Sequence, residues 1–180
     1  MTEDTKTILN YLKIKGKKVA SRLDFVKLLR EHYESGNTSY PREAYFFAIA
    51  RSLIFEADER FEQAGKSDPE LIDLANKMKI IRNQHHLEDD EDFWIDDSDT
   101  PEEYKRLYAL RDDQAHDMET STMREFGEKE MAELYNNNRL EYERRYDAGF
   151  CLLYESDPDF DKTLKDLKQS RQDELPHLEL

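Results

Sequence analysis

Residues 42–63 read REAYFFAIARSLIFEADERFEQ and form the most apolar stretch of the chain. Apolar residues recur in it every three or four positions, so they cover one wide face of a helix. These residues are Phe46, Phe47, Ala50, Leu53, Ile54, Ala57 and Phe61. We therefore expect this stretch to be the central core helix.

Turn-forming residues are too scarce for a β fold. The 180 residues include only five Gly and five Pro, whereas an all-β domain needs a turn about every 8 to 12 residues. An apolar share of 37% with 11% aromatic residues predicts a thin, aromatic-rich core. The expected fold class is all-α, an irregular bundle of about six to seven helices with one long C-terminal helix and an acidic central loop.

Helix start signals divide the chain on both sides of the core helix. Residues 21–24 (Ser-Arg-Leu-Asp) look like a capping box that opens a helix to about residue 33. Residues 67–70 (Ser-Asp-Pro-Glu) restart a helix after Gly65. Residues 100–103 (Thr-Pro-Glu-Glu) look like a second capping box, with Pro at the first helical position. That helix is expected to break or recap at residues 120–122.

The segment from residue 123 to residue 154 is a candidate for one long helix. Its tyrosines fall at near-helical spacing, at Tyr135, Tyr142 and Tyr146. The asparagines at 136–138 leave its continuity open. The tyrosine-rich stripe is either part of the core or a self-association seam, so a homodimer is among the expected assemblies.

The net charge of −15 is unevenly distributed. Residues 1–36 hold eight bases against five acids, so they carry +3 and the other 144 residues carry −18. We expect a basic helical hairpin at 1–36, packed on an acidic helical domain at 37–172, with a flexible tail at 173–180. The hairpin could also be a helix-turn-helix DNA reader. The acidic body repels phosphate backbones, which argues against nucleic acid as a partner except through the first 36 residues, and it favours a basic protein surface.

Cysteine use and hydropathy exclude several other classes. The single Cys151 rules out an internal disulfide and a Cys-based zinc cluster. No window approaches the ~18 consecutive apolar residues of a membrane span, and no charged-then-apolar leader is visible. We expect a cytoplasmic protein that has no membrane partner and needs neither metal nor cofactor.

Residues 88–103 hold ten acids, no base and the only Trp of the chain. Carboxylates spaced like phosphates, with aromatic anchors among them, would suit the basic groove of another protein. The predicted partner-binding residues are Asp89, Asp90, Asp92, Phe93, Trp94, Asp96 and Asp97. The alternative is an acidic loop that its Phe-Trp-Ile segment pins to the protein's own core.

Residues 111–116 (Arg-Asp-Asp-Gln-Ala-His) are similar to the Arg-polar-x-x-x-His signature of the HEPN ribonucleases, which are all-helical dimers. The resemblance implies metal-independent RNA cleavage in which His116 acts as general acid or base and Arg111 holds the phosphoryl oxygens. On an unbroken helix the two side chains would point about 140° apart. A solvated helix face is therefore the alternative interpretation.

Residues 56–59 (Glu-Ala-Asp-Glu) and 70–73 (Glu-Leu-Ile-Asp) are similar to the paired acidic motifs of the MazG-type nucleotide pyrophosphohydrolases. The resemblance implies four carboxylates on facing helices that hold magnesium. Only ten residues separate the two motifs, which is short for that family. We expect a non-enzymatic protein that binds a basic protein surface, as a nucleic-acid mimic or small regulator, with the ribonuclease and then the pyrophosphohydrolase as alternatives.

Overall fold

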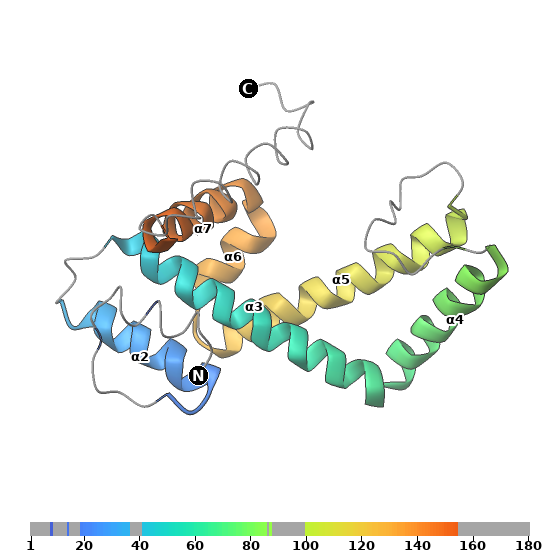
Figure 1. Ribbon diagram of the computed structural model, residues 1–180, viewed down its shortest axis with the longest axis horizontal. Coiled ribbons are helices and arrows are strands. Elements are labelled where there is room, and N and C mark those ends of the chain that lie inside the picture. Colours follow the sequence, from blue (N-terminus) through green and yellow to red (C-terminus); the bar gives the residue numbers. More distant parts are fainter. Residues whose placement is uncertain are drawn as a thin grey trace, which may run out of the picture. The chain divides into compact units, whose positions relative to one another are not determined.

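The computed structural model describes residues 8, 14, 19–36, 41–85, 87 and 100–154 (Figure 1). Within these ranges the chain forms six helices and no strand. The helices are α2 (Arg22–Glu34), α3 (Arg42–Ser67), α4 (Pro69–His85), α5 (Glu102–Glu125), α6 (Lys129–Asn137) and α7 (Arg139–Tyr154). The predicted all-α fold class is therefore confirmed.

Two predicted helix starts are confirmed by their caps. The Ser21 hydroxyl accepts a hydrogen bond of 3.1 Å from the backbone N–H of Asp24 at the start of α2. The Asp68 carboxylate accepts from the N–H of Glu70 at 2.8 Å, at the start of α4. Both side chains satisfy amide groups that the first turn of a helix leaves without partners.

The capping box predicted at residues 100–103 is wrong. Pro101 has φ −58° and ψ 135°, so it precedes the helix, and α5 begins one residue later at Glu102. This shift leaves Thr100 too far from the amides of the first turn to cap them. Its Oγ1 atom is buried and has no hydrogen-bond partner in the part of the chain that the structure describes.

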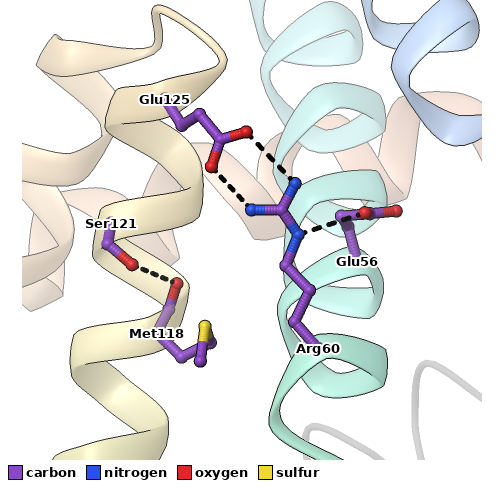
Figure 2. A network of polar contacts seen from close by, with 5 residues as sticks. All are labelled: Glu56, Arg60, Met118, Ser121 and Glu125. Carbon is purple, nitrogen blue, oxygen red and sulfur yellow. Dashed lines mark hydrogen bonds and ion pairs between the residues drawn. The ribbon is translucent and has the colours of Figure 1, made fainter. Parts of the chain in front are cut away.

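The helix break predicted at residues 120–122 is also wrong, because α5 continues through them to Glu125. The hydroxyl of Thr120 donates to the Asp117 carbonyl at 3.2 Å. The hydroxyl of Ser121 donates to the Met118 carbonyl at 3.0 Å, as Figure 2 shows. Each hydroxyl thus bonds a carbonyl of the preceding turn of α5, and the helix continues through both residues.

The single long helix predicted for residues 123–154 is two helices that follow the end of α5. Gly127 has φ +84°, a left-handed conformation that glycine adopts readily and that ends a helix. Asn138 has φ −147° and ψ 63°, which separates α6 from α7. The helix is therefore interrupted at the asparagines, an outcome that the sequence did not decide. A second break lies at Gly127.

The chain divides into two compact units. The terminal unit comprises Met1–Ala50 and Leu140–Leu180, and the inserted unit comprises Arg51–Arg139. Helix α3 contributes its first part to the terminal unit and its remainder to the inserted unit. The division predicted at residues 36 and 172 stays a prediction, because residues 37–40 and 155–180 lie outside the described part of the chain.

In the terminal unit, α7 packs its aromatic residues on α3. The fully buried Phe47 ring lies 4.7 Å from the Tyr146 ring and 5.6 Å from the Phe150 ring, between centroids. Phe46 and Tyr142 make a similar edge contact at 5.4 Å. These aromatics of the tyrosine-rich stripe thus contact α3 of the same chain, while a homodimer stays a prediction.

In the inserted unit, α4 and α5 share a small apolar cluster. It contains the buried residues Leu74, Met78, Ile81 and Tyr104, with Leu87 and Leu107 packed against them. Three of these lie on the apolar stripe that helical spacing gives α4, at i, i+4 and i+7. None of the helices in the described ranges is both long enough and apolar enough to cross a membrane.

Candidate functional site

A surface groove with a volume of about 340 Å³ is lined by residues of α3 and α5 in the inserted unit. Residues three or four positions apart on one helix share a face, and each helix supplies such a set. The lining residues of this α3–α5 groove are Asp58, Phe61 and Glu62 from α3, and Tyr108, Arg111, Asp112 and Ala115 from α5.

The groove combines aromatic walls with negative charge. The guanidinium carbon of Arg111 lies 5.9 Å from the centroid of the Phe61 ring, a cation–π arrangement. Three carboxylates and one guanidinium line the groove, so the lining carries a formal charge of −2. This is a surface suited to an organic cation.

Two of these carboxylates lack partners among the described residues. Glu62 and Asp112 are both exposed, and neither has a hydrogen bond or an ion pair to any described residue. The third carboxylate, that of Asp58, affects a neighbour. Burial is the main cause that raises the pKa of Glu119, and the negative charge of Asp58 raises it further.

An arginine network ties α3 to the end of α5 (Figure 2). The Arg60 guanidinium donates to both carboxylate oxygens of Glu125, at 2.7 and 3.3 Å, and to Glu56 at 3.2 Å. It also lies 5.3 Å from the Phe126 ring centroid. Hydrogen bonding to Arg60 holds the pKa of Glu125 below its ordinary value. The forked geometry joins α3 to the last turn of α5 through two parallel hydrogen bonds.

A second polar cluster joins α5 to α6. The His116 ring stacks on the Tyr135 ring at 4.8 Å, and its Nε2 atom donates to the side-chain amide oxygen Oδ1 of Asn136 at 2.6 Å. The Tyr135 hydroxyl donates to Glu119, and the Arg139 guanidinium lies 3.9 Å from the centre of the same ring. Burial and the bond to Glu119 raise the pKa of Tyr135 to about 12. The hydroxyl therefore stays protonated at neutral pH.

The structure gives Arg111 and His116 different neighbours. Helix α5 is continuous through both, so their side chains leave it about 140° apart. Arg111 lies on Phe61 in the α3–α5 groove, whereas His116 is stacked against α6. A ribonuclease site within one chain would need the two side chains to converge on one phosphate, and here they do not.

The four carboxylates of the MazG-like motifs are likewise not gathered into a metal site. No group of three or more His, Cys, Asp or Glu residues in the described ranges is placed to hold a metal ion. Glu56 is bonded to Arg60, and Asp73 forms an ion pair with Lys77 at 2.6 Å. The cysteine Cys151 is half-buried on α7.

The predicted partner-binding residues all lie outside the described part of the chain. They are Asp89, Asp90, Asp92, Phe93, Trp94, Asp96 and Asp97. They nevertheless belong to the inserted unit, whose sequence holds 25 acids and 12 bases. That unit therefore carries −13 of the formal net charge of −15, and the terminal unit carries −2.

Sequence reasoning missed both clusters. It placed Phe61 on the core face of α3 and Tyr135 on the tyrosine-rich stripe, and it did not single out Glu62 or Glu119. A local signal existed for the groove, since Tyr108 and Asp112 stand four residues apart on a helix. No signal existed for the cluster around Tyr135, because the position of α6 depends on the turn at Gly127.

Comparison of the chain with models of known protein families, with curated proteins and with solved structures gives no match.

Proposed function

We propose that this protein is a non-enzymatic, acidic helical protein that binds a basic surface of another protein, as a nucleic-acid mimic or small regulator. The observation that carries the proposal is the concentration of charge in the inserted unit, −13 out of −15. Like charges gathered in one compact unit repel one another and destabilise it. A basic partner relieves this repulsion, and long-range attraction speeds the encounter.

Residues 88–99, which we call the acidic stretch, supply the contact residues in this proposal. Its carboxylates attract the basic surface, while Phe93 and Trp94 bury apolar area at the centre of the contact. Eight acids between residues 88 and 99 account for more than half of the charge of the unit. The stretch is therefore the first place to test.

The test starts with affinity capture from the native host at low and high salt, followed by binding measurements on each purified partner. We expect partners with basic surfaces and an association that weakens steeply with salt. One variant neutralises the acidic stretch, by Asp89→Asn, Asp90→Asn, Asp92→Asn, Asp96→Asn and Asp97→Asn. A matched variant removes five acids from the terminal unit, by Glu31→Gln, Glu34→Gln, Asp173→Asn, Glu174→Gln and Glu179→Gln.

Both variants reduce the net charge to −10, so they separate location from total charge. Weakening confined to the first variant supports the proposal. Unchanged binding in the first variant contradicts it. Equal weakening in both would mean that net charge alone drives association, and would remove the acidic stretch from the proposed function.

The ribonuclease alternative is tested separately, by an RNA cleavage assay without metal ions. Cleavage that disappears in both Arg111→Gln and His116→Ala would overturn the non-enzymatic part of the proposal. We expect the wild-type protein to show no cleavage above that of a buffer control.

A further inference from the structure

The α3–α5 groove has the features of a receptor for one cationic side chain. Its volume of about 340 Å³ lies at the small end of the ~300 to 1,000 Å³ range of ligand pockets. Phe61 and Tyr108 supply aromatic surface from opposite helices, and Glu62 and Asp112 supply carboxylates from the same two helices. An extended cation lying in the groove would therefore meet aromatic rings and carboxylates together.

The arrangement favours an organic cation over a metal ion. A metal ion requires several oxygen ligands that converge on one point at about 2 to 2.6 Å. The three groove carboxylates form no such group, although all three belong to the described residues. A guanidinium or ammonium group is less demanding, because it can bond carboxylates at separate points along the groove.

The chain itself seats a guanidinium in this groove. Arg111 lies over Phe61 at 5.9 Å, so the aromatic wall is already used by the cation that it suits. Counting Arg111, the lining still carries −2, and Glu62 and Asp112 have no partner among the described residues. The groove thus has negative charge left for a second cation, and an arginine fits both of its features through planar stacking and forked donors.

We infer that the α3–α5 groove receives an arginine side chain from the basic surface of the partner, an inference that rests on the proposed function. Glu62 and Asp112 would bond the incoming guanidinium, and Tyr108 would cover its hydrocarbon stem. Arg111 competes with it for Phe61 and repels it. The groove is therefore a specific contact within a larger, charge-driven association.

The inference is tested by NMR titration of the full-length protein at low salt with the hexapeptide Gly-Gly-Arg-Arg-Gly-Gly. Peptides with lysine or with uncharged citrulline in place of arginine serve as ligand controls. We expect a Kd on the order of 1 mM for the arginine peptide, weaker binding of lysine, and none of citrulline. Shifts should concentrate on the residues that line the groove.

Two matched protein variants locate the binding. Glu62→Gln with Asp112→Asn should weaken the arginine peptide about tenfold, since it removes both unpaired carboxylates. Asp113→Asn with Asp117→Asn makes the same charge change at exposed positions of α5 outside the groove, and should have little effect. Arg111→Gln should tighten binding, because it removes the internal competitor. A phosphate-binding role of Arg111 predicts no such gain.

Equal weakening of the peptide in both double variants would overturn the inference, because it would show general attraction to an acidic surface. Spermidine that binds the groove as tightly as the arginine peptide would also overturn it, in favour of a small polyamine. Neither result would touch the proposed function, because the partner-binding part of that proposal fails when neutralising the acidic stretch leaves binding unchanged. Unchanged partner binding in the variant of the acidic stretch would, in turn, not alter the result of the peptide titration.

Discussion

Thr122 shows how a single polar atom can oppose the packing around it. The residue is fully buried on α5, and its Oγ1 atom has no hydrogen-bond partner among the described residues, whereas the hydroxyls of Thr120 and Ser121 bond the preceding turn. Burial of an unsatisfied hydroxyl costs free energy that a methyl group of similar size avoids.

Thr122→Val is therefore expected to raise the free energy of unfolding by about 1 kcal/mol. Thermal and urea unfolding measure the change. Ser121→Ala is the control, because that hydroxyl is exposed and bonded to Met118, and its effect should stay within about 0.5 kcal/mol. A loss of stability in Thr122→Val would mean that the hydroxyl has a partner in solution.

Glu119 predicts a dependence of stability on pH. Burial raises its pKa in the folded protein above the unfolded value, although the bond from Tyr135 acts in the opposite direction. A raised folded-state pKa means that the folded state binds the proton more tightly. The stabilisation is complete below the unfolded pKa and is lost as the pH rises through the folded pKa.

We therefore expect Glu119→Gln to stabilise the protein at pH 7 to 8 relative to wild type. Gln removes the buried charge and still offers an oxygen to the Tyr135 hydroxyl. The advantage should shrink as the pH falls toward 4.5, the ordinary pKa of the carboxyl. Melting temperatures of both proteins across this range measure the difference. An advantage that stays constant with pH would contradict the assignment to this carboxyl.

Among the helices, two starts were predictable, whereas the start of α5 and the break at Gly127 were not. Ser21 and Asp68 cap helices through bonds to residues two or three positions away, so the signal is local. Glycine disfavours a helix at both Gly65 and Gly127, but only one of the two helices ends there. Gly65 lies inside α3, whereas Gly127 takes φ +84° and ends the run that α5 begins. Tertiary packing decides between these outcomes, and a local pattern does not contain it.

Gly149 on α7 is required by close helix packing. A Cβ atom there would lie 2.1 Å from the Glu43 carbonyl oxygen and 2.5 Å from the Phe47 Cβ atom on α3. Gly149→Ala must therefore push α7 away from α3, and should lower the free energy of unfolding by about 2 kcal/mol or more. Chemical denaturation measures the loss.

Gly65→Ala is the matched control for this prediction. A Cβ atom at Gly65 meets no atom within 4 Å, and the residue lies inside α3. The same substitution should therefore stabilise the protein by about 0.5 to 1 kcal/mol, through helix propensity. Changes in the free energy of unfolding that have the same sign for Gly65→Ala and Gly149→Ala would contradict the close packing of α7 on α3.

At the scale of the whole molecule, composition predicted the fold class, because scarce turn residues and helical periodicity are properties of the entire chain. The groove was not predictable in the same way. Glu62 and Asp112 stand 50 positions apart in the sequence, and their shared lining depends on how α3 and α5 pack. The charge of −13 can be counted from the sequence, but its assignment to one compact unit depends on which residues contact one another in the fold.

The division of the chain also fixes an order of events during synthesis. The inserted unit, Arg51–Arg139, is continuous in sequence, whereas the terminal unit needs α7, which follows it along the chain. A ribosome delivers residues at only ~5 to 20 per second. The inserted unit can therefore finish folding before Tyr146 and Phe150, the ring partners of Phe47, have been synthesised. In the nascent chain, Phe47 therefore lacks its contacts with Tyr146 and Phe150 until α7 emerges.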